Sequence, residues 1–475
     1  MCIAREKPRA YNKRYVEGLF MKKKMEKRGE YLFDNRSLAV LIFPLVVEQL
    51  LAILVGMADS IMVASVGEAA VSGVSLVDNI MVLFINLFAA LATGGAVIAG
   101  QYLGQGDRKL SGKAATQLLW FVLVVSLGIT ALLYLGKSFI LHRVFGAIDA
   151  DVMGHANTYL MIVTASIPFV AVYNGGAAIF RAMGNSKVSM VVSIIMNVIN
   201  CGGNAILIYG FHCGTEGVAI PTLVSRMVAA FLVIFLLLRT KGAAIRLEKN
   251  VIRFRFNGRM VGQILSIGLP NGLENSMFQL GKILVLSLVS TFGTSAIAAN
   301  AVANAVALFQ ILPGIAINLA ITSVIARCIG AGKHDQAQYY TKKLIGITYA
   351  SMILMNVLIY LALPFILHAY HLSPETYESA RKILLLHGSC CILIWPISFS
   401  LPSTLRAAGD AKVTMWISIV SMWFCRIVMS YVFGKYLGFG VFGVWIAMIL
   451  DWCVRSVGMI WRYRSGKWKL IRSID

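Results

Sequence analysis

The sequence predicts an all-α polytopic membrane protein with twelve transmembrane helices in two six-helix lobes. Three observations support this prediction: the apolar composition, the number of long apolar segments and an internal repeat. Of the 475 residues, 58% are hydrophobic and 13% are charged, whereas an ordinary soluble domain carries roughly 25% charged residues. So few ionisable groups cannot cover a water-soluble surface of this size. The composition therefore argues against soluble enzymes, nucleic-acid-binding factors and disordered scaffolds.

The apolar segments give the number of spans. A transmembrane helix needs about 20 predominantly apolar residues, and twelve windows of this kind occur in the chain. The first window is too long for a signal peptide and is not followed by a small-residue cleavage site. The windows lie near residues 38–65, 71–100, 115–135, 156–180, 188–210, 217–238, 262–290, 296–325, 344–367, 383–405, 413–434 and 441–461.

The basic residues predict that both termini are cytoplasmic, because cytoplasmic loops carry an excess of lysine and arginine. With both termini inside, the inner segments hold 34 of the 43 lysines and arginines, and the outer segments hold five. We expect a multi-pass protein of the cell inner (plasma) membrane. The net charge of +22 is then explained by the topology, and it would attract the protein to anionic lipids. No basic patch interleaved with aromatic residues suggests nucleic-acid binding.

The two halves of the chain repeat each other at a constant offset. At an offset of 226, Pro44 matches Pro270, Glu48 matches Glu274, Gly67 matches Gly293, Gly104 matches Gly330, and Gly106 matches Gly332. At an offset of 225, the loop residues 181–190 match residues 406–415. Because six spans separate the repeats, the halves have the same orientation and are related by an axis along the membrane normal, as in transporters that rock two bundles around a central site.

The repeat also sets the expected domain organisation. We expect a basic cytoplasmic arm over residues 1–36, a first lobe over 37–238, a cytoplasmic linker over 239–260, a second lobe over 261–461 and a basic cytoplasmic tail over 462–475.

Several motifs give the chain a resemblance to a known family. They are Pro44 followed by Asp59 in the segment GMADSIMV, the paired Arg-Ala-x-Gly-x-x-Lys loops, the Gly-x-Gly-Asp sequence that ends at Asp107, and the closing segment that starts at Gly443. In order and spacing they resemble the multidrug and toxic compound extrusion (MATE) family of cation antiporters. The resemblance implies two lobes around a central cavity, export of small organic cations and energy from inward flow of protons or sodium ions.

Asp59 is the first candidate for ion coupling. An ionisable side chain at membrane depth is costly and therefore marks a functional site by default. A protonatable carboxylate there can hold a proton when cargo is absent and release it when a cation arrives. In the fifth span, Asn204 stands where the proton-coupled members that it resembles carry an aspartate, so sodium coupling or a single-carboxylate scheme stays open. Alternatively, Asn197 or Asn204 satisfies Asp59 in a purely structural role.

Glu48 and its repeat mate Glu274 are further coupling candidates. Glu48 precedes Asp59 by eleven residues, which is close to three helical turns, so both acids face the same side roughly 16 Å apart. This spacing suggests a polar path from the cytoplasmic end toward the cavity, with Glu274 as a partner for a cationic cargo. The alternative is that each glutamate only serves the bend at the neighbouring proline.

Other polar residues within the spans are assigned by helical spacing. Asp451 and Arg455 form an i, i+4 pair that we expect to be structural, and Arg426 joins this network in the prediction. Arg226 needs an acid, and pairing with Asp59 would weaken the proton scheme. Lys282 either pairs with Glu274 or repels cations. The expected lining of the substrate cavity is Gln49, Asp78, Asn86, Gln279, Lys282 and Asn300.

Competing functions find less support in the sequence. There is no nucleotide-binding GxxxxGK[ST] segment and no hydrolase motif, so neither an ATP-driven pump nor an enzyme is expected. No metal site and no cofactor other than the coupling ion are expected, and we expect a monomer. The remaining rival is a lipid-linked oligosaccharide flippase of the same superfamily. Its anionic cargo would need a cationic cavity, whereas the candidate cavity acids here outnumber the clear bases.

Overall fold

The computed structural model describes residues 31–146, 148–239, 244–247, 256–471 and 474, and every regular element in them is helical. Residues 1–30 of the expected arm, most of the linker and part of the tail lie outside the described residues. The first half contains α2 (Asn35–Ala64), α3 (Glu68–Gly104), α4 (Arg108–Leu135), α5 (Lys137–Phe139), α6 (Ala150–Thr164), α7 (Ile167–Ala182), α8 (Ser186–Ala205) and α9 (Glu216–Arg239). The second half contains α10 (Gly258–Ser290), α11 (Thr294–Gly330), α12 (His334–Ala369), α13 (Pro374–Trp395), α14 (Leu401–Ala407), α15 (Ala411–Ser421) and α16 (Gly440–Arg464). Short π-helical turns extend or join some of these helices, at Ile140–Val144 (η1), Ile206–Gly210 (η2), Pro396–Ser400 (η3), Met422–Val428 (η4) and Tyr431–Tyr436 (η5), and a 3-10 turn follows at Lys467–Leu470 (η6).

The helices are long and apolar enough to cross a membrane. Ten helical segments of the described chain meet this condition by length and composition, and the bent pair α6 and α7, at 47°, supplies an eleventh. The one expected span that does not meet this condition is the window at 262–290, which corresponds to α10. This helix is 33 residues long but less apolar, because it contains Asn271, Glu274, Gln279 and Lys282. Large apolar side chains such as Phe43 and Leu135 are exposed, as expected for a surface that faces lipid.

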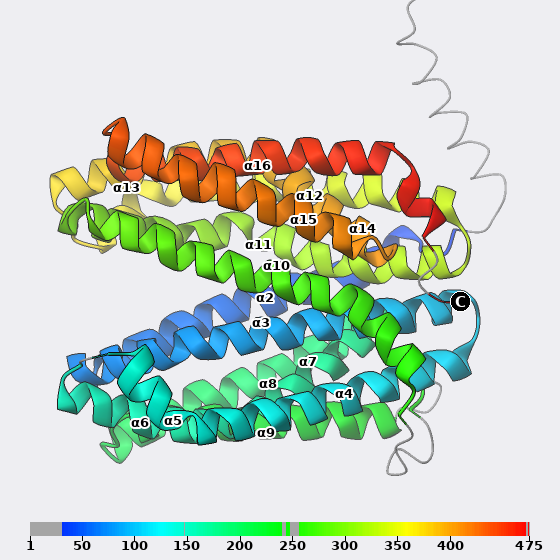
Figure 1. Ribbon diagram of the computed structural model, residues 1–475, viewed down its shortest axis with the longest axis horizontal. Helices are drawn as coiled ribbons and strands as arrows, with labels where there is room; N and C mark the ends of the chain where they lie inside the picture. The colour runs from blue at the N-terminus through cyan, green and yellow to red at the C-terminus, as the bar shows by residue number, and fades with distance from the viewer. Residues whose placement is uncertain (1–30, 147, 240–243, 248–255, 472–473, 475) are drawn as a thin grey trace, which may run out of the picture.

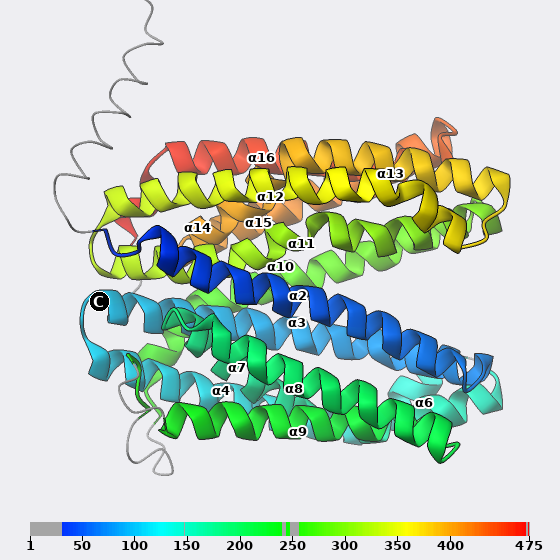
Figure 2. The same cartoon turned by 180° about the vertical axis from the view of Figure 1, so that it is seen from behind.

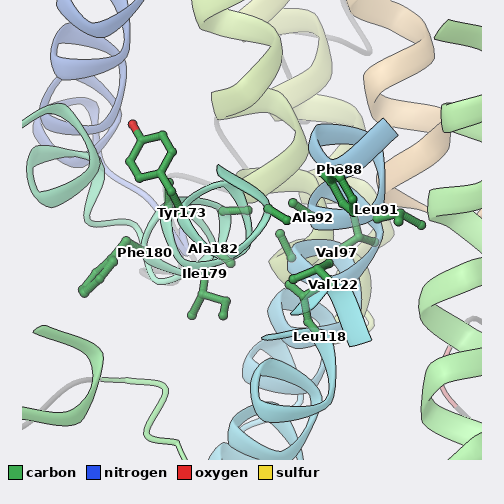
Figure 3. Packing of buried hydrophobic residues seen from close by; sticks show 14 of the residues in the cluster. Phe88, Leu91, Ala92, Val97, Leu118, Val122, Tyr173, Ile179, Phe180 and Ala182 are labelled. Carbon is green, nitrogen blue, oxygen red and sulfur yellow. The ribbon is translucent and has the colours of Figure 1, made fainter. Parts of the chain in front are cut away.

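The helices form two bundles, which are seen from both sides in Figures 1 and 2. Helices α2 to α9 form the first lobe, in the lower half of each view, and α10 to α16 form the second lobe above it. The core of the first lobe is made where α3, α4 and α7 pack together (Figure 3). Its labelled residues are Phe88, Leu91, Ala92, Val97, Leu118, Val122, Tyr173, Ile179, Phe180 and Ala182.

The repeated glycines mark turns that need a left-handed backbone. Gly106 and Gly332 have φ angles of 84° and 66°, and both follow the second helix of their lobe. Gly184 and Gly409, in the paired basic loops, have φ angles of 80° and 95°. A side chain would be strained in this region, so the same residue type recurs at the repeat offset because the same turn recurs in each lobe.

The two lobes touch at the end of the molecule that holds the described termini, which we call the termini end. There α3 and α11 contact each other through residues that are equivalent in the repeat. A Cβ atom added to Gly104 would lie 2.2 Å from the carbonyl oxygen of Arg327, and one added to Gly330 would lie 1.9 Å from that of Gln101. Gln101 and Arg327 are themselves mates at the repeat offset of 226. The internal two-fold axis therefore passes between these helices, and only glycine permits the backbones to approach so closely.

The segment before α2 adds a second contact at the termini end. The backbone amide of Phe33 donates to the hydroxyl of Tyr340 at 2.9 Å, and that hydroxyl donates to the carbonyl of Phe33 at 2.6 Å. The guanidinium of Arg327 lies 4.9 Å from the centre of the Phe33 ring. The start of the first lobe is thus held by α11 and α12 of the second lobe.

Toward the other end of the molecule, which we call the far end, the same helix faces become exposed. Val82 and Ser75 precede Gly104 by about six and about eight helical turns, and so share its face of α3. Both are exposed, and so are their repeat mates Leu308 and Ala301 on α11. The lobes are therefore closed at the termini end and separated at the far end, by a space that we call the central opening.

The glycine contact can be tested by adding one methyl group. We expect Gly330→Ala to lower the free energy of unfolding by about 1–3 kcal/mol, because the new Cβ collides with backbone that cannot rotate away. The measurement is denaturant unfolding of the purified protein in detergent. Gly346→Ala is the control, since nothing lies within 4 Å of a Cβ at that helical position. Equal stability of the two variants would contradict the role of this contact.

Candidate functional site

Asp59 is held by two amides in the first lobe. Nδ2 of Asn204 on α8 donates to Oδ1 of Asp59 on α2 at 2.8 Å. Asn200 lies one turn earlier on α8. Both ends of its side-chain amide have hydrogen-bond partners when the nitrogen points toward Asp59. It then donates to both carboxylate oxygens at 2.9 and 3.0 Å and accepts from Thr222 at 3.0 Å. Asn200 and Asn204 are buried, whereas Asp59 is partly exposed. The site thus offers a carboxylate whose partners are neutral.

Asn200 takes the place that the sequence analysis gave to Asn197. The structure contains no hydrogen bond between Asn197 and Asp59, and the Asn197 amide nitrogen is buried without a partner. Residues 200 and 204 are four apart and lie one above the other on a helix, whereas residue 197 is seven from 204, about 10 Å along the axis. The i, i+4 spacing of two asparagines opposite an aspartate was the signal that could have identified Asn200.

A second group of charges lies in the same lobe. The hydroxyl of Tyr159 on α6 donates to Oδ1 of Asp78 at 2.9 Å, and Arg226 on α9 donates to the hydroxyl of Ser166 at 2.7 Å. Among the described residues no carboxylate oxygen lies within 4 Å of Arg226. Asp59, Asp78 and Arg226 are nevertheless near enough to interact electrostatically. Asp59 is therefore not tied up in an ion pair with Arg226.

Glu48 and Glu274 have arginine partners in the last turns of α7 and α14, which precede the paired glycine turns. Nη1 of Arg181 lies 3.4 Å from Oε1 of Glu48, and Oε2 of the same carboxylate accepts from the hydroxyl of Ser189 at 2.8 Å. In the second lobe, Nη1 of Arg406 lies 3.9 Å from Oε2 of Glu274. Both glutamates are buried. These contacts do not support the expected polar path from Glu48 to Asp59 or the expected cargo contact of Glu274, since each charge is neutralised within its own lobe.

The second lobe contains the expected ion pair of Asp451 and Arg455, but two other cations are placed differently from the expectation. Nη2 of Arg455 lies 3.3 Å from both carboxylate oxygens of Asp451, and Ser421 donates to Asp451 at 2.5 Å. Arg426 does not join this ion pair: its guanidinium lies over the ring of Phe278, 4.9 Å from its centre. Lys282 does not pair with Glu274, because its ammonium also lies at the Phe278 ring, 5.2 Å from the centre.

The uncharged residues expected to line the cavity divide into two groups. Gln49, Asn86 and Gln279 are half-buried, and Gln49 and Gln279 lie on helices that pack across the boundary between the lobes. Asn300 is buried inside the second lobe, where its Oδ1 accepts from the indole of Trp445 at 3.1 Å. Asn300 therefore does not line the central opening, because its helical position turns it toward α16.

A buried polar cluster of the second lobe was missed by the sequence analysis. Nδ1 of His387 lies 2.5 Å from Oε1 of Gln310, and Asn356 donates to the carbonyl of Gln310 at 3.3 Å. These residues are scattered over three helices, so spacing along the chain gave no signal. The described residues contain no group of three histidine, cysteine or acidic side chains suited to a metal ion.

Removal of the Glu48 charge tests whether the first glutamate pair is structural. We expect Glu48→Gln to lower the free energy of unfolding by about 3 kcal/mol, because it leaves Arg181 charged and unpaired where the two side chains are 15% and 9% exposed. Glu378→Gln is the control: its partner Arg381 and Glu378 itself are about half exposed, and such pairs contribute about 0–1 kcal/mol. Denaturant unfolding in detergent measures both, and an unchanged stability of Glu48→Gln would argue against the structural role.

Comparison with known proteins agrees with this architecture. The MatE family model matches residues 44–206 and again residues 270–432, so it recognises both repeats. The uncharacterized transporter YisQ of Bacillus subtilis is 28% identical over 91% of this chain and 94% of its own length. The probable multidrug resistance protein NorM of Thermotoga maritima is 23% identical over 92% and 93% of the two chains. An outward-facing structure of a multidrug resistance MATE family transporter superposes with a TM-score of 0.85 at 21% identity, covering 92% of this chain and 96% of the other. The chain therefore belongs to the MatE family of multidrug efflux transporters and is a multi-pass membrane protein, not an enzyme.

Proposed function

We propose that the protein exports cationic amphipathic compounds in exchange for protons or sodium ions, with Asp59 as the residue that binds the coupling ion. The observation that carries this proposal is the environment of Asp59: a carboxylate at membrane depth whose direct partners are the neutral side chains of Asn200 and Asn204. Because no arginine or lysine is paired with it in the described part of the chain, the carboxylate is free to bind a proton or a small cation. Glu48 and Glu274, each with an arginine partner, are not available in this way.

The two ends of the molecule suggest a direction of transport. We place the termini end at the cytoplasm, since the segments that join the helices there carry most of the lysine and arginine residues. The central opening then faces outward. Export requires this state to exchange with one that opens to the cytoplasm, by separation of the Gly104 and Gly330 contact and closure of the far end. The basic segments at the termini end also favour anionic lipids of the inner leaflet of the cell inner membrane. We propose that each monomer acts alone.

The cargo and the ion compete for one set of charges. Asp59 and Asp78 are two carboxylates of the first lobe that interact electrostatically with one cation, Arg226. A cationic amphipath that enters the opening is attracted to these carboxylates, and binding of a proton or sodium ion at Asp59 weakens that attraction. Exchange of cargo for ion then follows from occupancy of one acidic site. The names of several relatives, which describe them as probable multidrug resistance proteins, are consistent with such cargo.

One observation favours the second candidate, a flippase for lipid-linked oligosaccharides. Lys282 and Arg426 lie together at Phe278 without a carboxylate partner among the described residues, and an anionic pyrophosphate carrier would be attracted to them. The multidrug relatives and the environment of Asp59 in the first lobe make the exporter the better-supported function.

The first experiment uses the purified protein in proteoliposomes. A fluorescent organic cation is followed under an imposed proton gradient and then under an equal sodium gradient, with protein-free vesicles as the control. Movement driven by one of the gradients identifies the coupling ion. Lack of movement under both would contradict the exporter and lead to an assay with lipid-linked cargo.

Replacement of the candidate carboxylate gives a direct test. We expect Asp59→Asn to abolish gradient-driven export while the protein still folds and inserts, because the amide preserves the shape of the site but cannot bind a proton or neutralise a cation. Export is measured in the same proteoliposomes, and folding by gel filtration in detergent. Asp151→Asn is the matched control, since Asp151 is exposed at the start of α6. Export by a well-folded Asp59→Asn protein at the wild-type rate would refute the assignment.

A further inference from the structure

The residues just before α2 belong to the first lobe but are bound to the second. The hydroxyl of Tyr340 on α12 bridges the backbone amide and carbonyl of Phe33. The Phe33 ring is 7% exposed and meets the Tyr340 ring edge-on, with the ring centres 5.7 Å apart. The guanidinium of Arg327 on α11 lies over the same ring. We call residues 31–35 the strap, and we call the two side chains that contact the Phe33 ring its socket.

The strap continues along α12 on both sides of Phe33. The backbone amide of Leu32 donates to Oε1 of Gln336 at 3.1 Å. The ammonium of Lys343 donates to Oδ1 of Asn35. Positions 336 and 343 are seven residues apart, or about two helical turns. The strap therefore binds a continuous stretch of the second lobe and not a single residue.

The second lobe begins with a matching contact to the first. The backbone amide of Asn257, just before α10, donates to Oε1 of Gln117 on α4 at 3.1 Å. At the repeat offset of 226, Asn257 corresponds to Tyr31 of the strap, and Gln117 corresponds to Lys343. The segment that leads into each lobe is thus bound by the equivalent helix of the other lobe.

Only the strap of the first lobe has an apolar anchor. At the same offset, Phe33 corresponds to Arg259 and Tyr340 corresponds to Ala114. Arg259 is exposed, whereas Phe33 is buried, and alanine has no hydroxyl that could bridge the backbone. The buried ring and its two hydrogen bonds are therefore a device that the repeat did not supply.

The strap has no slack. Helix α2 begins at Asn35, so that Asp34, the N-cap of the helix, is the one residue between Phe33 and α2. These two residue steps span at most about 7 Å. The start of α2 is in turn fixed to its own lobe, because the hydroxyl of Ser186 on α8 donates to the carbonyl of Leu41 at 2.6 Å. A larger separation of the lobes at this end must pull Phe33 out of its socket.

The strap and the glycine contact between the lobes meet at one residue. The carbonyl oxygen of Arg327 is the atom that leaves no room for a side chain at Gly104, and the guanidinium of Arg327 lies over Phe33. Movement of the first lobe away from α11 therefore breaks both contacts together.

We propose that the strap locks the two lobes together at the termini end, and that Phe33 must leave its socket each time the protein opens to the cytoplasm. This inference rests on the proposed exchange between outward and inward states, and it names the contact that controls the exchange. Burial of the ring and the hydrogen bonds to Tyr340 favour the outward state. Loss of these contacts shifts the equilibrium toward the inward state.

A covalent bond between the strap and α12 gives the first test. Asn35→Asp places a carboxylate at the ammonium of Lys343, and a water-soluble carbodiimide then joins the two groups in an amide bond. We expect the cross-linked protein to lose gradient-driven export of the fluorescent cation in proteoliposomes. It should keep its affinity for the same cation in detergent, measured by fluorescence anisotropy, because the central opening stays accessible. Mass spectrometry of the peptides gives the extent of cross-linking.

Two controls separate the strap from other effects of the reagent. Wild-type protein treated in the same way has an amide at position 35 and cannot form this bond. Arg381→Lys provides a lysine three residues after Glu378 on α13, so the reagent can form a cross-link within one helix of the second lobe. The two treated controls should export at equal rates, and faster than the cross-linked protein.

A weaker strap should shift the equilibrium in the opposite direction. Tyr340→Phe keeps the ring but removes the hydroxyl that bridges the backbone of Phe33. We expect hydrogen exchange, followed by mass spectrometry in detergent, to become about tenfold faster at the backbone amides around Gly104. Exchange at the far end should become slower, because the lobes close there as they part at the termini end. Tyr349→Phe is the matched control, since its hydroxyl donates to the carbonyl of Leu393 within the second lobe.

Two outcomes would overturn the inference. One is export by the cross-linked protein at the rate of the treated wild-type protein. The other is faster exchange of Tyr340→Phe in the strap alone, with no change around Gly104 or at the far end. Hydrogen exchange involves neither cargo nor an ion gradient, so failure here is distinct from failure of gradient-driven export. If wild-type protein does not export the cation but exchange changes as expected, the strap stands and the exporter is refuted.

Discussion

The structure depends on the cost of placing a charge at membrane depth. A side chain such as glutamate or arginine costs about 2.5–3.5 kcal/mol there on insertion scales, so each charge must be neutralised by a partner or serve a purpose that compensates for this cost. Glu48 with Arg181, Glu274 with Arg406 and Asp451 with Arg455 meet the first condition. The charges that remain without an ion pair are therefore the informative ones.

The internal repeat explains where those remaining charges lie. Duplication provides the same turns, the same proline-containing helices at Pro44 and Pro270, and the same ion pair between the first helix of each lobe and an arginine at the end of α7 or α14. These shared features position the helices. Asp59 and Lys282 do not follow the repeat, because their mates are Val285 and Gly56. The scaffold is thus symmetric while the charges that it carries are not.

Closure at the termini end depends on side-chain size. Glycines at 104 and 330 let the backbones of α3 and α11 meet at the termini end. Larger residues on the same faces, such as Val82 and Leu308, are exposed farther along. In the proposed exchange between outward and inward states, this contact between backbones is the one that separates.

The sequence by itself determined the membrane environment, the helical fold, the repeat and the family, because each of these depends on local composition or on spacing along the chain. It also singled out Asp59, since a lone carboxylate in an apolar span is visible without a structure. The partners of each charge were decided only by tertiary structure. Arg181 for Glu48, Asn200 for Asp59 and Phe278 for Arg426 come from helices far apart in sequence. Which side chains meet across such distances is set by helix packing, for which residue spacing carries no signal.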